Sequence, residues 1–239
     1  MFSKFNLRNN IDLIDKLFRY NLKIIFANKF IYFLLAAVGF FIFVTIVSLF
    51  SSSDSNVQSV YYLQLFPGIL LIFYPTTFGI QNDEDSRMLE IIFSIPNYRY
   101  KVWLVRMIII YIIVFALLIV LSILSYFAIA VVPIFEMSYQ LMYPIFFLGS
   151  FAFMISTVIR NGNGSAIIMI IIGLVFWISS GILQYSEWNI FLNPFDLPRD
   201  VSEVIWQTVM TNNRLYLLAG IILTQLFGLF NLQNREKFV

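Results

Sequence analysis

The chain contains neither cysteine nor histidine among its 239 residues. These absences exclude disulfides, thiolate and imidazole metal sites, cysteine or histidine nucleophiles and histidine proton transfer. The phosphate-binding pattern G-x-x-x-x-G-K-[ST] is also missing, so the sequence does not predict ATP binding by that device. Charged residues are scarce at 12%, while 60% of the residues are hydrophobic. Soluble domains have about 25% charged and about 45–50% apolar residues, so the composition indicates an integral membrane protein.

Long apolar runs with almost no charged side chains account for this composition. Each is long enough to cross about 30 Å of hydrocarbon at about 1.5 Å per residue. The signal is continuous rather than alternating, which predicts helices and not the strands of a barrel. We therefore expect one all-α membrane domain over residues 1–239 with six spans, at 31–50, 60–80, 104–132, 141–159, 165–184 and 215–232.

Neutral polar and small residues interrupt the spans. Gln64, Ser122 and Ser125 are interpreted as hydrogen-bonding groups between helices, with ligand contact as the alternative. Small residues that mark possible helix contacts are Gly149, Ala152, Gly173, Gly181, Gly220 and Gly228. The spans lack the acidic or basic residues that ion-coupled carriers keep within the membrane.

Lysine and arginine set the expected orientation, because they accumulate in the cytoplasmic connections of membrane proteins. With the N-terminus inside, only Arg199 and Arg214 of the 15 basic residues fall outside, which leaves 15 − 2 = 13 on the inner side. Both termini are therefore expected in the cytoplasm.

The segment before the first span predicts a helix along the inner membrane surface, over residues 10–29. Lys16, Arg19 and Lys23 recur at three- and four-residue spacing on one face, and such a basic helix suits anionic headgroups. An ordinary solvated helix beside the membrane is the alternative interpretation.

The most polar break in the first half of the chain predicts a short amphipathic helix over 83–96. Its apolar side carries Met88, Ile91, Ile92 and Ile95, and its charged side carries Asp83, Arg87 and Glu90, with Glu84 three residues before Arg87. Paired carboxylates first suggest catalysis, but successive acidic residues fan around a helix and nothing encloses them to raise a carboxylate pKa. We interpret the helix as a docking element, and a solvated connection without a partner is the alternative.

The longest external connection spans residues 185–214. Pro198 precedes an apolar set that includes Val201, Val204 and Ile205 on one face, which predicts a short helix entering the outer leaflet or covering the bundle.

At this point the chain resembles the permease subunits of ABC-2 type (type V) exporters. That family has a cytoplasmic motif after its second span, written E…GTLE..L..P, and Glu84, Leu89, Glu90 and Pro96 stand at the matching spacing. Its long connection before the last span has an N-P dipeptide and re-entrant helices, which Asn193, Pro194 and Phe195 match. The sequence departs from the motif at Arg87, where the family usually has glycine.

The resemblance implies one half of an exporter in a bacterial cytoplasmic membrane. Two ATPase subunits would bind beneath the chain and carry ATP and Mg²⁺, and a second permease copy or a relative would complete the pore. The helices at 10–29 and 83–96 would contact the ATPase, and this chain itself would bind no cofactor and catalyse no reaction. Membrane lipids are expected partners and nucleic acid is not.

Two other classes of function make different demands on the sequence. An intramembrane enzyme would need H-E-x-x-H, a pair of intramembrane aspartates or a serine with a base, and the sequence has none of these. A membrane scaffold or assembly factor that transports nothing stays open. The cargo of an exporter is not readable, although uncharged, aromatic-rich spans favour an apolar or amphipathic one.

Overall fold

The computed structural model describes residues 30–50, 56–85, 87, 92 and 99–233. This part of the chain is helical and contains no strand. Six helices are long and apolar enough to cross a membrane, as the hydropathy predicts: α2 (Phe30–Phe50), α3 (Val57–Thr77), α6 (Val105–Ala128), α7 (Ile134–Ile159), α8 (Gly162–Ile182) and α9 (Glu203–Asn231). Within the described residues two shorter helices accompany them, α4 (Gly79–Asp85) and the π-helix η1 (Arg99–Leu104).

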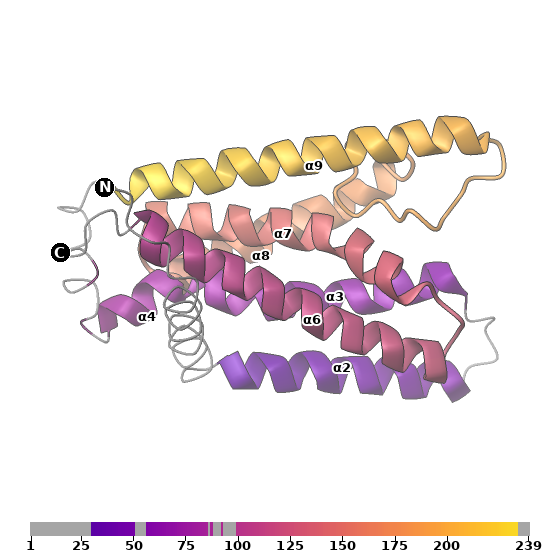
Figure 1. Cartoon of the computed structure of the whole chain (residues 1–239), viewed down its shortest axis with the longest axis horizontal. Helices are drawn as coiled ribbons and strands as arrows, with labels where there is room; N and C mark the ends of the chain where they lie inside the picture. The colour runs from indigo at the N-terminus through magenta and orange to yellow at the C-terminus, as the bar shows by residue number, and fades with distance from the viewer. Residues whose placement is uncertain (1–29, 51–55, 86, 88–91, 93–98, 234–239) are drawn as a thin grey trace, which may run out of the picture.

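The six long helices run lengthwise and alternate in direction, as Figure 1 shows. The helix α4 lies at one end of the bundle, together with the connection between α7 and α8. The first residues of α3, α7 and α9 lie at the opposite end. We call these the α4 end and the opposite end.

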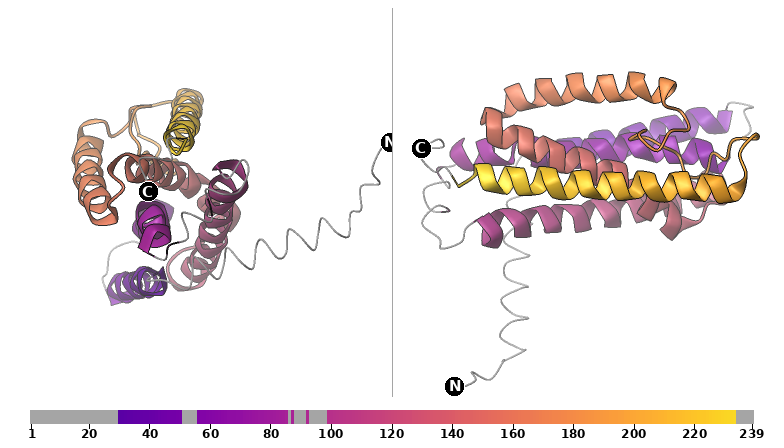
Figure 2. Two further views of the ribbon diagram at one scale, coloured as in Figure 1. Left: turned by 90° about the vertical axis from the view of Figure 1, so that its left-hand side faces the viewer. Right: turned by 90° about the horizontal axis from the view of Figure 1, so that it is seen from above.

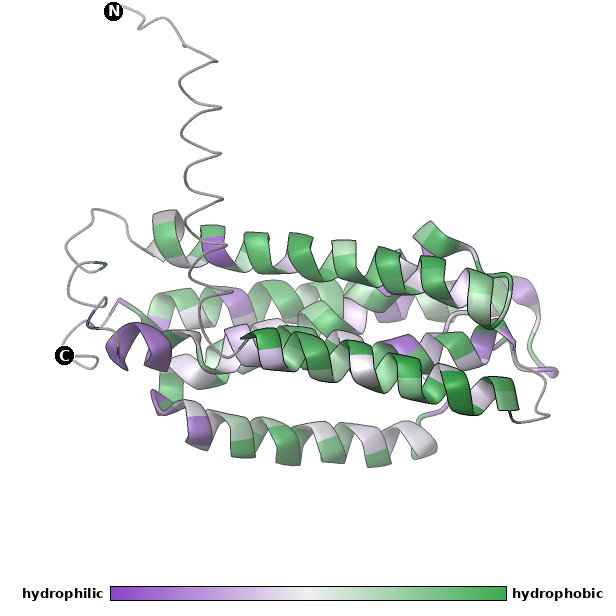
Figure 3. Ribbon diagram, turned by 90° about the horizontal axis from the view of Figure 1, so that it is seen from below, coloured by the Kyte–Doolittle hydropathy of each residue, from purple (hydrophilic) through white to green (hydrophobic). Residues whose placement is uncertain are grey.

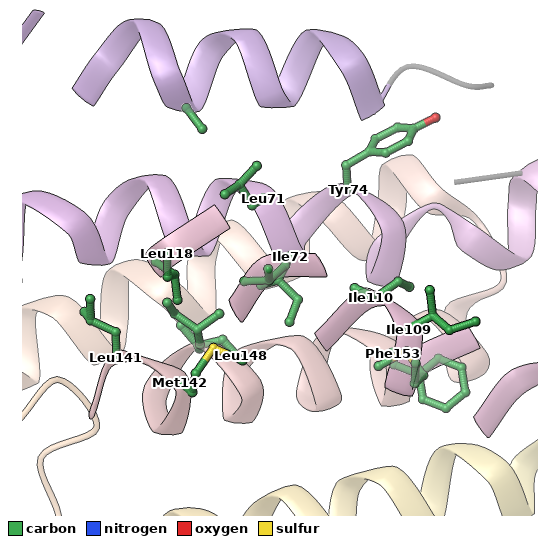
Figure 4. Packing of buried hydrophobic residues seen from close by; sticks show 14 of the residues in the cluster. Leu71, Ile72, Tyr74, Ile109, Ile110, Leu118, Leu141, Met142, Leu148 and Phe153 are labelled. Carbon is green, nitrogen blue, oxygen red and sulfur yellow. The ribbon is translucent and has the colours of Figure 1, made fainter. Parts of the chain in front are cut away.

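Helices α3 and α7 form the interior of the bundle. Seen along the helix axes, α2, α6, α8 and α9 surround them (Figure 2), and α7 packs against α3, α6, α8 and α9. Ile72 of α3 lies near Leu118 of α6 and Leu148 of α7 in the apolar core, and Leu71 lies on the other side of α3 (Figure 4). Most of the buried polar side chains of the long helices lie on α3, α6 and α7.

A buried hydrogen-bond network joins three of these helices. Gln64 Nε2 donates to Ser125 Oγ at 2.9 Å, and Ser122 Oγ donates to Gln64 Oε1 at 2.8 Å. Ser138 of α7 lies 3.0 Å from Ser122, between the two hydroxyl oxygens. All four side chains are fully buried, so the expected hydrogen bonding between helices is confirmed for Gln64, Ser122 and Ser125.

The peripheral helices expose apolar side chains. Helix α8 is the least buried of the six, with Leu174, Val175 and Ile178 all exposed. Figure 3 shows apolar residues along the long helices and hydrophilic ones mainly near the ends, α4 among them. In water such a surface would aggregate, whereas hydrocarbon solvates it.

Several helix boundaries differ from the predicted ones. Helix α7 begins at Ile134 and not at 141, directly after Pro133, which is preorganised to precede a helix. Helix α6 ends at Ala128 rather than 132, in line with the bias against helical backbone just before Pro133. The separate external helix is wrong as predicted: Val204 and Ile205 lie in the first turns of α9, and no proline or glycine interrupts the chain from there to Gly220.

Candidate functional site

The α4 end combines a buried ion pair with an exposed charged surface. Helix α4 follows α3 after Phe78, the C-cap of α3, whose N–H still donates to Tyr74 O at 3.0 Å. Asp83 on α4 is only 3% exposed, and Arg106 on α6 is 5% exposed. The Arg106 guanidinium donates to Asp83 Oδ2 at 2.7 Å, so one short, charge-assisted contact ties α4 to α6.

The surroundings of Arg106 place its guanidinium. The π-helix η1 leads into α6 and carries Trp103, three residues before Arg106. The guanidinium carbon lies 4.8 Å from the centroid of the Trp103 ring, which is within cation–π range. Arg106 Nε has no hydrogen-bond acceptor among the described residues. The cation is therefore held by one carboxylate oxygen and one aromatic face.

Burial governs the ionisation of Asp83. Desolvation raises the pKa of this carboxyl above its ordinary value, and the Arg106 guanidinium opposes the rise through its charge and its hydrogen bond. The carboxylate is thus more costly to ionise in the folded protein than in the unfolded chain. The Arg106 cation lowers the free-energy cost of keeping this carboxylate ionised in the folded protein.

Helix α4 is also attached to α8 and α3. Gln81 Oε1 accepts a hydrogen bond from the Gly162 N–H at 2.6 Å, at the first residue of α8. A Cβ at Gly162 would lie 2.5 Å from this oxygen and 2.5 Å from Phe78 Cδ1, so only glycine permits the approach. Asn82 Nδ2 donates to the hydroxyl of Tyr74 on α3 at 3.2 Å. A displacement of α4 would therefore act on three spans at once.

The predicted docking residues divide into two groups. Glu84, Asp85 and Arg87 are exposed, as a docking surface requires. Asp83 is not: the sequence pattern places it on the exposed face, but it is buried against Arg106. Ile92 of the apolar side is buried. Leu89, Glu90 and Pro96, and likewise Lys16, Arg19 and Lys23 of the predicted surface helix, lie outside the described residues.

The predicted helix over 83–96 is not one continuous helix. Helix α4 begins four residues earlier, at Gly79, and ends at Asp85. Arg87 then has a φ of 55°, which is left-handed backbone. A residue in this conformation cannot continue a right-handed helix, and the periodic spacing that pairs Asp83 with Arg87 does not apply across it.

Asn193, Pro194 and Phe195, the motif expected on the outer side, fasten the long connection to the bundle. Asn193 is buried, and its Oδ1 accepts from the Phe195 N–H at 3.0 Å while its Nδ2 donates to Gln58 O at 3.1 Å. Gln58 Nε2 in turn donates to Phe195 O at 3.1 Å. Trp206 Nε1 donates to Pro194 O at 3.2 Å. Asn193, Pro194 and Phe195 thus hold the start of α3 and the start of α9 together.

Sequence reasoning missed the two buried arginines. Arg106 and Arg214 are counted there as cations of the connections, because each stands at the edge of an apolar run. Their burial depends on partners far along the chain, Asp83 and Gln140, which no local pattern reveals. Each of the two arginines is the last charged residue before a long uncharged run, and this position was the available signal of burial in the sequence.

In the part of the chain that the structure describes, no three acidic side chains lie close enough together to hold a metal ion. Comparison of the chain with known protein families, with curated proteins and with solved structures finds no match. The arrangement at the α4 end itself suits mechanical transmission: exposed charges lie on a helix whose buried side is bonded to three spans.

Proposed function

We propose that this chain is the membrane-spanning permease subunit of an ATP-driven ABC-2 type exporter. The observation that carries the proposal is the attachment of α4. Its exposed Glu84 and Asp85 face solvent, while Asp83 is bonded to Arg106 of α6 and Gln81 to the start of α8. An ATPase bound to the charged side of α4 would thereby transmit its movement directly to α6 and α8.

The conformation of Arg87 also supports the proposal. This residue stands where the exporter motif usually has glycine, and its backbone is left-handed. Glycine adopts that conformation at no steric cost. The family's usual glycine is therefore the residue that the left-handed backbone at this position favours.

In the proposed arrangement the α4 end faces the cytoplasm of a bacterial cell. The positive-inside rule supports this orientation, with both termini on the same side. Two ATPase subunits carry ATP and Mg²⁺ below the α4 end, and a second copy or a relative of this chain completes the pore. The cargo is apolar or amphipathic.

The proposal is tested by reversing the exposed charges of α4. The double variant Glu84→Lys/Arg87→Glu should weaken co-purification of the ATPase about tenfold or more, because like charges then oppose each other across the contact. Vanadate-sensitive ATP hydrolysis by the complex should fall in parallel.

The matched control is Arg199→Glu/Asp200→Lys, which reverses two exposed neighbouring charges at the opposite end. It should leave ATPase binding unchanged. If no nucleotide-binding protein co-purifies with the unmodified chain, the exporter proposal fails and the scaffold interpretation takes its place. If the ATPase binds both variants equally, docking through this face of α4 is wrong.

A further inference from the structure

Two stacked aromatic rings lie where the apolar run of α9 begins. Trp188, in the connection between α8 and α9, packs on Tyr216 with the ring centroids 4.5 Å apart and the planes at 5°. Tyr216 is the second residue after Arg214, the last charge on α9, so the rings stand at the border between headgroups and hydrocarbon. Trp188 is 63% exposed. Because Tyr216 covers one face of the indole, the exposed surface of Trp188 is its other face and its edges.

A carboxylate without a cation accompanies this stack. The partly exposed Glu187, next to Trp188 in the chain, accepts a hydrogen bond at Oε2 from Asn212 Nδ2 at 2.9 Å. Asn212 precedes Tyr216 by four residues, so the carboxylate lies on the same face of α9, about 6 Å farther from the hydrocarbon. The headgroup layer of one leaflet is about 5–8 Å thick, which places the carboxylate at headgroup depth. Within the described residues no basic side chain lies at ion-pair distance from Glu187.

Helix α9 holds the ring and the carboxylate in place. Asn213 Nδ2 donates to Glu187 O and to Asn189 O, both at 2.8 Å, so one buried amide fixes the backbone on both sides of Trp188. The preceding residue, Asn212, holds the carboxylate itself. The two groups are thus preorganised, which lowers the entropy cost of binding a ligand against them.

The chemistry of these groups selects a primary ammonium ion. An aromatic face attracts ammonium groups within about 6 Å of its centroid, and a carboxylate without a counterion attracts the same charge. At headgroup depth such a cation belongs to a zwitterionic phospholipid. The ammonium of ethanolamine has three N–H donors for the carboxylate, whereas the trimethylammonium of choline has none. An anionic headgroup would be repelled by Glu187.

We propose that Glu187, Trp188 and Tyr216 bind the headgroup of phosphatidylethanolamine from the leaflet at the opposite end. The ammonium donates to Glu187 and lies against the free face of Trp188. The acyl chains follow α9 into the bilayer, where the exposed Leu223 and Phe227 stand seven and eleven residues after Tyr216 on the same face. The site belongs to this chain alone and depends neither on an ATPase nor on the exporter proposal.

The test is native mass spectrometry of the full chain in detergent, titrated with phosphatidylethanolamine or with phosphatidylcholine of the same acyl chains. The unmodified chain should bind its first phosphatidylethanolamine with a Kd about tenfold lower, because only that ammonium hydrogen-bonds the carboxylate. Glu187→Gln should remove this preference, and it keeps an oxygen that can accept from Asn212. Glu203→Gln, the same change at an exposed carboxylate of α9, should have no effect.

A second variant separates the ring from the charge. Trp188→Leu should weaken the binding of both lipids about two- to fivefold, because either ammonium group can lie on the ring. Trp177→Leu is the matched control at the 57% exposed tryptophan of α8, and it should change neither affinity.

Three results would overturn the proposal. The first is equal affinity of the unmodified chain for the two lipids, and the second is a Glu187→Gln protein that still prefers phosphatidylethanolamine. The third concerns the source of the ammonium group. Glycerophosphoethanolamine, the same headgroup without acyl chains, should not displace the lipid, and displacement at equal concentration would show that the site takes a free amine from water.

Discussion

At the scale of single residues, Asp83 and Arg106 depend on each other for their burial. Desolvation raises the pKa of Asp83, and Arg106 is the group that counteracts the rise. Removing one partner of a buried ion pair typically costs about 3–5 kcal/mol. The carboxylate would escape this cost by taking up a proton.

Arg106→Met should therefore destabilise the fold in a pH-dependent way. Without Arg106 the folded-state pKa of Asp83 rises further, so the folded protein binds a proton that the unfolded chain has released. Stability is then retained below the ordinary carboxyl pKa, about 3.9, and falls as the pH rises through the folded value. Thermal unfolding in detergent at pH 5 and pH 8 should show the larger loss at pH 8.

The control is the double variant Arg106→Met/Asp83→Asn, which removes the carboxylate as well. It should recover most of the stability at pH 8 and lose the pH dependence. Glu84→Gln, which neutralises the exposed carboxylate next to Asp83, should recover nothing in the Arg106→Met background. An equal loss at both pH values would show that Asp83 stays ionised regardless of its partner.

Arg87 has a different constraint, which lies in its backbone. Its left-handed φ of 55° is cheap for glycine and most costly for a β-branched residue. Arg87→Gly should leave the free energy of unfolding unchanged or raise it by up to about 1 kcal/mol. Arg87→Val should lower the free energy of unfolding and with it the melting temperature. A melting temperature that Arg87→Val does not lower would contradict the left-handed assignment.

The sequence could predict the charges near this end but not their roles. A period of 3.6 assigns Asp83 and Arg87 to one face only if the helix continues through both. Helix α4 ends at Asp85, and Arg106, the partner of Asp83, is 23 residues away. Long-range pairing is not encoded in local periodicity, so the ion pair stayed hidden while the exposure of Glu84 was predicted.

At the scale of helices, the packing of α7 against α9 depends on two glycines of α9. A Cβ at Gly220 would lie 2.6 Å from Phe147 Cε2, and one at Gly228 would lie 2.7 Å from Phe153 Cε1. Both neighbours are rigid rings of α7, which cannot bend aside as a flexible chain end can. Gly173 of α8, by contrast, has no heavy atom within 4 Å of its Cβ position.

Gly220→Ala and Gly228→Ala should therefore destabilise the protein by about 1–3 kcal/mol, through overpacking at the α7–α9 contact. Gly173→Ala is the matched control in an equally apolar helix, and it should be neutral or raise stability by about 0.5–1 kcal/mol because alanine favours helix. Thermal unfolding of the three single variants measures whether Gly220→Ala and Gly228→Ala destabilise the protein more than Gly173→Ala does. Equal effects at all three positions would mean that helix propensity alone is at work.

Span prediction succeeded because hydropathy depends on composition, whereas boundaries depend on local breakers. Polar residues interrupt the first turns of α9, so the continuous apolar run starts near 215 although the helix starts at Glu203. Of the small residues chosen from sequence, Gly149, Gly220 and Gly228 make close contacts, but Gly173 and Gly181 face open space. Which face of a helix meets a neighbour follows from the order of all six helices around α3 and α7, which no single segment contains.

At the scale of the whole molecule, orientation decides whether α4 can meet a cytoplasmic ATPase. The alternating helices put Glu84 at the α4 end and Asp200 at the opposite end, both exposed. The distribution of basic residues predicts that the α4 end is inside. Because the chain has no cysteine, any cysteine introduced at these positions is the only thiol, and the unmodified protein is the blank.

Asp200→Cys should react with a membrane-impermeant maleimide on intact cells, whereas Glu84→Cys should react only after the membrane is permeabilised. The physical reason is that the reagent reaches only thiols on its own side of the bilayer. The reverse pattern would leave the helical fold intact but place Glu84 and Arg87 beyond the reach of ATP, which would end the exporter proposal.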